Sequence, residues 1–329
     1  MKNVLSTRGL TTHFVTNRIE IIAVDTVDLS VEERQIVGIV GESGSGKSTV
    51  ANSILRILPE TGKLIFGSMV FKGENLLGLK EKEMQQRIRG NEISMIFQDP
   101  MVSLNPVFTV GTQIVDVIRL HQHCSTREAK AKAIDLFKKV GISDPERRFY
   151  NYPHELSGGM IQRMVIAMAM SCQPSLIIAD EPTTALDVTI QNQILEEFEN
   201  LVRGVGVSVM WISHDLGVIR RVSDYVYVMY AGRILEEGGV ETIFHNPLHP
   251  YTQGLLEANP IFHEPKNEIP TIRGELGEIT SRGCNFYPRC QKGNKACSKE
   301  NIPLTRVSED HFVRCKELAV HGRDEKESD

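Results

Sequence analysis

No stretch of this 329-residue chain is apolar for long enough to cross a membrane. A transmembrane helix needs about 18 or more consecutive apolar residues, and the longest candidates, such as Met164–Met170, have the size of a core segment. The first residues also lack the apolar stretch of a secretion signal. We therefore expect the protein to work in the cytoplasm, with any membrane role coming through a partner.

An excess of positive charge is missing as well. The chain has 37 lysines and arginines against 42 aspartates and glutamates, so its formal net charge is −5. This balance argues against a general nucleic-acid binder, and we expect no nucleic acid among the partners. An apolar content of 41% and a charged content of 24% are ordinary for a globular protein. The length leaves room for one large domain and a smaller one.

Closely spaced cysteine pairs are also absent. Four of the six cysteines fall late in the chain, at Cys284, Cys290, Cys297 and Cys315. The gaps between them are five, six and seventeen residues, whereas structural zinc usually draws on pairs with two to four intervening residues. Disulfides are disfavoured in a reducing cytoplasm. Four thiolates suit an iron–sulfur cluster, with zinc and unligated thiols as alternatives. The nearby cations that could offset a cluster's negative charge are Arg282, Arg289, Lys292, Lys295 and Arg314.

What the sequence does contain is a run suited to holding phosphate, Gly41-Glu42-Ser43-Gly44-Ser45-Gly46-Lys47-Ser48-Thr49. An apolar strand candidate, 35–40, precedes it and an apolar-periodic segment follows it, which is the context that the pattern GxxxxGKS/T requires. Backbone N–H groups would converge on an anion, helped by the helix dipole. Lys47 would reach the β- and γ-phosphates, and Ser48 would ligate Mg²⁺. The alternative is a merely flexible Gly/Ser loop.

Apolar periodicity predicts an α/β architecture. Further strands are expected at Ile93–Phe97, Leu176–Ala179, Val207–Ile212 and Tyr225–Met229, after β segments within residues 4–40. Helical spacing is found in Val110–Leu120, Ala129–Val140 and Val188–Val202. Strand–helix alternation predicts a largely parallel, buried sheet, interrupted by a helical block between about 105 and 155. Three prolines after residue 259 predict a domain boundary there.

Two further segments have the chemistry of a nucleotide site. The strand at 176–179 leads into Asp180 and Glu181, whose side chains point to opposite sides, so that Asp180 can join a Mg²⁺ shell while Glu181 orients or deprotonates water. A strand that ends in a polar turn is the alternative. The run Leu156-Ser157-Gly158-Gly159-Met160 combines an N-cap serine with two glycines at a helix start, which makes a second anion site or an ordinary capped helix.

Single polar residues follow the strands. Gln98 comes directly after the strand at 93–97, and its amide could contact metal-bound water. His214 follows the strand at 207–212 and could donate a hydrogen bond to a phosphate oxygen. Asp187 follows the carboxylate pair closely and could do no more than cap the next helix. Without context, each is equally well explained as a surface residue.

The order and spacing of these features resemble the ATPase subunits of ATP-binding-cassette (ABC) transporters, over roughly residues 4–258. The resemblance implies a P-loop NTPase with a mostly parallel core, an N-terminal antiparallel β subdomain and a helical subdomain at about 99–160. It implies that ATP binds Gly41 and Ser43–Thr49, with Ser48, Gln98 and Asp180 around Mg²⁺. The roles it implies for single residues are Glu181 as catalytic carboxylate, Gln98 as Q-loop, Asp187 as D-loop and His214 as switch histidine.

The resemblance also implies a dimeric mechanism. In this family the run Ser157–Met160 is the signature motif, which binds the ATP held by the opposite subunit. Two subunits facing head-to-tail would sandwich two ATP molecules, and hydrolysis would remove the preference for the closed dimer.

Three features resemble the dipeptide and oligopeptide importers in particular. They are the run Asn246-Pro247-Leu248-His249-Pro250-Tyr251-Thr252-Gln253, the methionine at Met160 and the four late cysteines. This likeness implies a [4Fe–4S] cluster on Cys284, Cys290, Cys297 and Cys315, in a C-terminal extension spanning 259–329. It also implies a second ATPase subunit, related or identical, two transmembrane permeases and a solute-binding protein outside. The chain itself would then lie at the cytoplasmic face of the membrane as a peripheral subunit. Import of oligosaccharides or metal complexes, a soluble ABC ATPase and a redox-regulated ATPase are the alternatives.

One position departs from the family pattern. Family members stack adenine on an aromatic residue about 29 positions before the Walker lysine, and Arg18 stands there in this chain. Because a guanidinium is planar, arginine can also stack on a base. We therefore expect Arg18 to contact the adenine.

Overall fold

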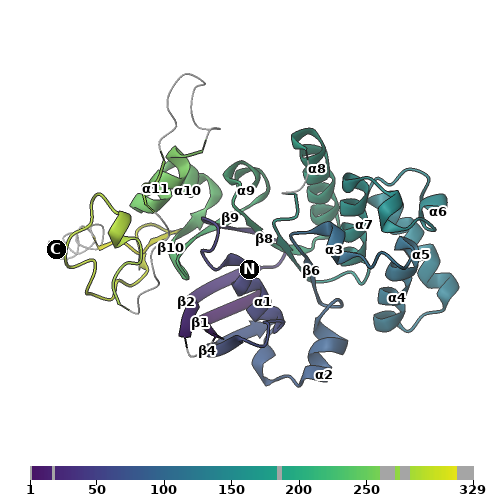
Figure 1. Ribbon diagram of the computed structural model, residues 1–329, viewed down its shortest axis with the longest axis horizontal. Helices are drawn as coiled ribbons and strands as arrows, with labels where there is room; N and C mark the ends of the chain where they lie inside the picture. Colours follow the sequence, from purple (N-terminus) through teal and green to yellow (C-terminus); the bar gives the residue numbers. More distant parts are fainter. Residues whose placement is uncertain (1, 17–18, 184–186, 260–270, 275–281, 317–329) are drawn as a thin grey trace. The chain divides into compact units, whose positions relative to one another are not determined.

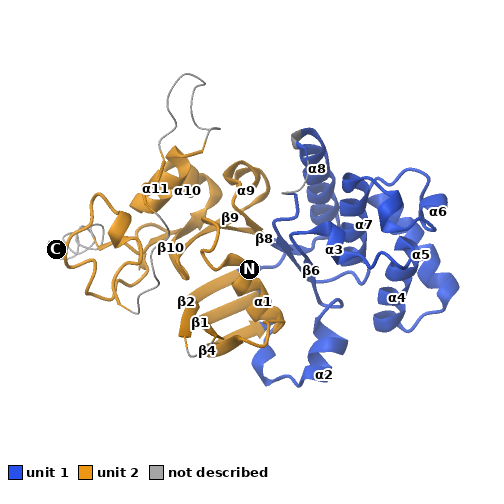
Figure 2. Cartoon of the chain, viewed as in Figure 1, with its two compact units in different colours: residues 1–4, 31–35, 71–211 blue, residues 5–30, 36–70, 212–329 orange. Residues whose placement is uncertain are grey.

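The computed structural model describes residues 2–16, 19–183, 187–259, 271–274 and 282–316 (Figure 1). The chain forms two compact units, shown in Figure 2. Unit 1 comprises residues 1–4, 31–35 and 71–211, and unit 2 comprises 5–30, 36–70 and 212–329. Among the described residues, no helix has both the length and the apolar character needed to cross a membrane.

The strands of unit 1 confirm those expected from apolar runs. β6 (Ile93–Ile96) and β7 (Leu176–Asp180) pair in parallel, with Ile93 opposite Leu176. Every residue of β7 and of β8 (Ser208–Ser213) is buried. Such strands need apolar side chains on both faces, which explains why the sequence reads as continuous apolar runs rather than alternation.

The helical block expected between about 105 and 155 is present in unit 1. Its main helices are α4 (Val110–Gln122) and α5 (Thr126–Lys139), which pack against each other and against α7 (Gly158–Met170). Ser125 starts α5 with a capping box, in which it accepts from the Glu128 N–H and donates its own N–H to the Glu128 carboxylate. The shorter helices of unit 1 are α2 (Glu81–Glu83), α3 (Pro100–Ser103) and α6 (Pro145–Arg148).

The helix α8 (Val188–Val205) is amphipathic, as its spacing predicts. Ile194, Phe198 and Val202 are buried. The ring of Phe198 meets the only tryptophan of the chain, Trp211, edge-on with 5.2 Å between ring centroids. This aromatic contact contributes to the core of unit 1 beyond its buried area.

Unit 2 contains two sets of strands. β2 (Ile19–Glu32), β1 (Asn3–Thr16) and β4 (Gly62–Phe71) are neighbours in that order. The short β5 (Glu74–Asn75) belongs to unit 1. In the second set, β3 (Ile36–Val40) pairs in parallel with β9 (Tyr225–Tyr230). The parallel pairs β3–β9 and β6–β7 confirm the expected parallel core.

The C-terminal part of the chain adds antiparallel strands to β9. β10 (Arg233–Gly239) pairs with β9, β12 (His311–Val313) with β10, and β11 (Thr305–Arg306) with β12. The α-helices within the described residues of unit 2 are α1 (Lys47–Leu55), α9 (Leu216–Val222), α10 (Val240–His245) and α11 (Pro250–Glu257). The predicted division into 1–258 and 259–329 stays a prediction.

Candidate functional site

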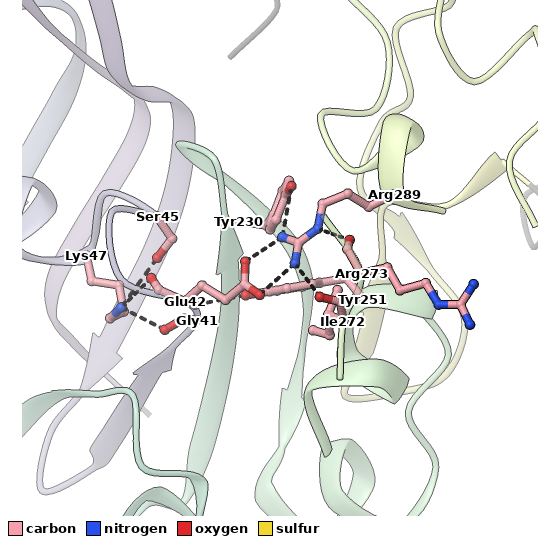
Figure 3. A network of polar contacts seen from close by, with 9 residues as sticks. All are labelled: Gly41, Glu42, Ser45, Lys47, Tyr230, Tyr251, Ile272, Arg273 and Arg289. Carbon is pink, nitrogen blue, oxygen red and sulfur yellow. Dashed lines mark hydrogen bonds and ion pairs between the residues drawn. The ribbon is translucent and has the colours of Figure 1, made fainter. Parts of the chain in front are cut away.

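The phosphate loop closes around its own lysine. It follows β3 and ends where α1 begins at Lys47, whose side chain is almost fully buried. The Lys47 Nζ donates to the Gly41 carbonyl at 2.8 Å and to the Glu42 carbonyl at 2.9 Å (Figure 3). The loop therefore holds its cation in place by its own backbone. These hydrogen bonds argue against the alternative of a flexible Gly/Ser loop.

Two glycines of this loop are required by its geometry. Gly41 has φ 154° and Gly46 has φ 104°. A Cβ on Gly41 would lie 2.0 Å from the Met229 carbonyl oxygen, and one on Gly46 would lie 2.4 Å from that of Ala23. Neither backbone oxygen can give way cheaply, so no other residue fits without moving the chain. The tight curl that results turns backbone N–H groups toward one point, which suits an anion.

The outer side of the same loop is open to solvent. Ser43, Gly44 and Ser48 are exposed, while Ser45 is fully buried. The Ser45 N–H donates to the Glu42 carbonyl at 3.2 Å, which closes the turn. The inner side of the loop is held by hydrogen bonds and the outer side is exposed. The loop can therefore bind a polyphosphate without first changing its conformation.

The residue that follows β7, Glu181, contacts Gln98, which stands two positions after the end of β6. The Gln98 Nε2 donates to the Glu181 Oε2 at 3.1 Å, and Asp180 is 5% exposed at the end of β7. Parallel strands present their carboxyl ends at one edge of a sheet, which is how residues 83 positions apart come together in unit 1. Glu181 has φ 47°, in the left-handed region that non-glycine residues rarely occupy. Such backbone strain is often found at functional sites.

The second predicted anion site lies at the start of α7. Ser157 occupies the N-cap and accepts from the Met160 N–H at 3.4 Å. Ser157 and Gly158 are exposed. The helix start is therefore capped by a single long hydrogen bond, with its remaining N–H groups directed outward. This geometry fits both the signature interpretation and an ordinary capped helix.

Three predicted site residues remain, namely Asp187, His214 and Arg18. Asp187 stands at the N-cap of α8, but the side chain of this described residue makes no capping hydrogen bond. His214 is exposed directly after β8. Arg18 lies outside the described residues. The roles assigned to all three stay predictions.

The four late cysteines line one pocket of unit 2. His249, Lys292 and Lys316 line the same pocket. Burial, together with a smaller contribution from the three other cysteines, raises the pKa of Cys284 to about 11. The described cysteines form no disulfide. No three His, Cys, Asp or Glu side chains within the described ranges are placed to hold one metal ion.

Two residues that contact the phosphate loop were not assigned to it from the sequence. The Arg289 guanidinium pairs with the Glu42 carboxylate, with Nη1–Oε2 at 2.6 Å and Nη2–Oε1 at 3.0 Å. The Tyr251 hydroxyl accepts from the Glu42 N–H at 2.9 Å. Tyr251 lies in the run 246–253 that the sequence singled out, so that run was a usable signal. Arg289 carried only the weaker signal of a cation beside a cysteine.

Comparison with protein-family models places two families on this chain. The model described as ABC transporter matches residues 24–184. The model described as oligopeptide/dipeptide transporter, C-terminal region, matches residues 235–297. The first match contains the phosphate loop and Glu181, and the second contains Tyr251 and three of the cysteines.

Relatives of similar length match nearly the whole chain. A protein of Sinorhizobium fredii named "Probable peptide ABC transporter ATP-binding protein" is 46% identical over 94% of this chain and 94% of its own. The "Probable D,D-dipeptide transport ATP-binding protein" of Escherichia coli is 46% identical over 90% of each chain.

Solved structures share the fold. The ATP-binding cassette MJ0796, in a dimeric post-hydrolysis state bound to ADP and phosphate, matches with a TM-score of 0.64 and 26% identity. That match covers 72% of this chain and 98% of the cassette. The protein cbiO1 of Clostridium perfringens has the same TM-score at 22% identity, over 75% of this chain and 92% of its own. These matches confirm the predicted P-loop fold. The chain belongs to the family of ABC transporter ATP-binding proteins, in the group that carries the oligopeptide/dipeptide transporter C-terminal region.

Proposed function

We propose that this chain is the ATP-hydrolysing subunit of an importer for dipeptides or oligopeptides. The observation that carries the proposal is a preformed phosphate loop in the same chain as the oligopeptide/dipeptide transporter C-terminal region at 235–297. The relatives named for peptide and D,D-dipeptide transport support this class of cargo.

The loop residues suit binding of the triphosphate. Gly41, Ser43–Thr49 and the Lys47 ammonium would hold the β- and γ-phosphates, because the curled backbone and the helix start favour anions. Ser48, Gln98 and Asp180 are the residues proposed to surround Mg²⁺, which neutralises phosphate charge when bound. We keep Arg18 as the proposed contact for adenine.

Glu181 is the proposed catalytic carboxylate. It would orient the attacking water and accept its proton as the bond between the γ-phosphorus and the oxygen of ADP breaks. The hydrogen bond from the Gln98 amide fixes the direction of this carboxylate. His214 is the proposed donor to a γ-phosphate oxygen, and Asp187 the proposed contact at the dimer interface.

A second cassette would complete the nucleotide site. The exposed helix start at Ser157–Met160 offers N–H groups to an anion outside its own unit. ATP contacting both subunits would favour a closed dimer, and hydrolysis would release it. The dimeric cassette bound to ADP and phosphate supports this arrangement. A related second subunit gives a heterodimer, and a second copy of this chain gives a homodimer.

Membrane partners have a candidate contact surface in unit 1. Four large apolar side chains near the helical block are exposed, namely Met101 (54%), Val102 (77%), Val107 (73%) and Phe108 (53%). Exposed apolar residues gathered in one segment often mark a protein interface. Two permease subunits bound here would hold the protein at the cytoplasmic face of the membrane, with a solute-binding protein acting from outside.

We also propose that the cysteine pocket holds a [4Fe–4S] cluster on Cys284, Cys290, Cys297 and Cys315. A tetrahedral zinc ion, with Zn–S bonds of about 2.3 Å, needs its sulfurs within about 3.8 Å of one another. A cluster binds each cysteine at a different iron, so its ligands stand farther apart. Four thiols around one pocket supply the number of ligands that such a cluster needs. Lys292 and Lys316 on the pocket wall would offset its negative charge.

The cluster is tested by colour and iron content. The protein purified without oxygen should be brown and contain iron, and Cys290→Ser should lose both. The matched control Cys124→Ser changes a cysteine in unit 1, outside this pocket, and should stay brown. A colourless wild type that carries zinc would refute the cluster.

The transport function is tested by Glu181→Gln in vesicles that contain the partner permeases. The variant should bind ATP as the wild type does, yet lose both ATP turnover and uptake of a labelled dipeptide. The exposed Glu196→Gln in α8 is the matched control and should keep both. Full turnover in Glu181→Gln would refute the catalytic assignment. Energised uptake of a sugar or metal complex in place of peptides would refute the cargo.

A further inference from the structure

Glu42, the second residue of the phosphate loop, is held from two sides by the C-terminal part of unit 2 (Figure 3). Its N–H donates to the Tyr251 hydroxyl at 2.9 Å. Its carboxylate makes two contacts with the Arg289 guanidinium, the shorter at 2.6 Å. A two-point pair between a planar guanidinium and a carboxylate fixes orientation as well as charge.

The guanidinium is itself held firmly. The Arg289 side chain is 6% exposed. Its Nε donates to the Arg273 carbonyl at 2.9 Å and its Nη2 to the Ile272 carbonyl at 3.2 Å. It also lies over the Tyr230 ring, 5.7 Å from the centroid. Arg289 is therefore a fixed positive group rather than a solvated side chain that happens to meet an acid.

The same residue, Glu42, also contacts the lysine of the loop. Its carbonyl accepts from the Lys47 Nζ at 2.9 Å. A carboxylate on this loop would repel a bound triphosphate if it were left uncompensated, because like charges at close range raise the free energy of the complex. In Figure 3 the Glu42 carboxylate points toward the Arg289 guanidinium and away from the Lys47 ammonium.

We propose that Arg289 is a positioning residue for nucleotide binding, which neutralises Glu42 and keeps the phosphate loop in its binding conformation. Tyr251 assists by holding the Glu42 backbone. The inference rests on the proposed role of the loop in binding ATP. It assigns a task in nucleotide affinity to a segment more than two hundred positions from the loop.

The test is a double-variant comparison of affinity for a non-hydrolysable ATP analogue with Mg²⁺. Arg289→Gln should weaken binding about tenfold, because Glu42 is then a bare acid beside the phosphates. Adding Glu42→Gln to that variant should restore most of the affinity, since the repulsion is gone. In ATPase assays the single variant should raise KM while kcat changes little. Arg306→Gln, an exposed arginine of the same C-terminal segment, is the matched control and should bind normally.

The rescue separates this role from a purely structural one. If Arg289 served only to pack the C-terminal segment, the double variant would bind no better than Arg289→Gln, and the proposal would be overturned. Unchanged affinity in Arg289→Gln would overturn it as well. If Arg289→Gln does not fold, Arg289→Lys takes its place, with a smaller loss that Glu42→Gln again relieves. A wild type that does not bind the analogue would refute the proposed nucleotide role itself.

Discussion

The phosphate loop of unit 2 and the turn before α7 in unit 1 differ in how much of their structure they supply themselves. In unit 2 the phosphate loop buries Lys47, bonds it to two of its own carbonyls and uses glycines that no other residue could replace. In unit 1 the turn before α7 is exposed and is held by one hydrogen bond of 3.4 Å from Met160 to Ser157. The first is a preorganised site. The second has the character of a half-site, which a partner's ligand would complete.

The largest expected effect comes from removing the lysine of the preorganised phosphate loop. Lys47→Ala should weaken ATP binding about a thousandfold, because a buried, oriented cation is lost from the phosphates and its two carbonyl acceptors lose their donor. Calorimetry of the isolated subunit measures the change. The exposed Lys63→Ala in β4 is the control and should bind as the wild type does. Near-normal affinity in Lys47→Ala would mean that the phosphates bind elsewhere.

The next effect concerns the half-site. Ser157→Arg should leave ATP binding to the isolated subunit unchanged but lower ATPase activity about a hundredfold, because a bulky side chain blocks a partner's nucleotide. Sedimentation with the ATP analogue should show no closed dimer. Ser125→Arg is a matched control, since Ser125 is also an exposed N-cap serine of unit 1. Loss of binding by the monomer in Ser157→Arg would erase the distinction between the two turns.

How far the sequence predicts this arrangement depends on whether the interaction is local. The phosphate loop, the cap at Ser157 and the carboxylates after β7 follow from patterns a few residues long, and the structure has them within a residue or two of the expected bounds. Gln98 and Glu181 were both predicted, and parallel pairing of β6 and β7 explains why they meet.

The contacts that the sequence did not predict are pairs of charged residues that lie far apart in the chain. β10 contains Arg233 and Glu236, both buried, in a segment that an apolar pattern does not identify as a strand. Arg233 pairs with Asp25 at 2.6 Å and Glu236 with His311 at 2.7 Å. Buried charges are tolerated only when paired, and the partners lie far away in sequence. The Glu42–Arg289 pair was missed for the same reason.

A smaller effect sharpens the comparison within unit 1. Gln98→Ala should lower kcat about tenfold and leave the affinity for ATP within about twofold, because the glutamine orients Glu181 and does not belong to the phosphate loop. Steady-state kinetics with a parallel binding measurement distinguish the two quantities. Gln193→Ala, in α8 and exposed, is the control. A large rise in KM without loss of kcat would place Gln98 with the binding residues instead.

The smallest expected effect concerns the strands that support the phosphate loop. Glu237 in β10 is partly buried, and its Oε1 accepts from the Tyr225 hydroxyl at 3.3 Å. Burial raises the pKa of Glu237 from 4.5 to about 7. Since the folded state holds this proton more tightly than the unfolded state, its contribution to stability is complete below pH 4.5 and is lost as the pH rises through 7. Between pH 6 and pH 8 the free energy of unfolding should therefore fall by about 1 kcal/mol through this group alone.

Glu237→Gln, which stays neutral, should remove that dependence. Hydrogen exchange of the β9 and β10 amides reports it locally, and amides of α4 and α5 in unit 1 serve as the internal control. An unchanged pH profile in the variant would mean that Glu237 is already ionised in the folded protein, so that its proton does not stabilise the strands beside the phosphate loop.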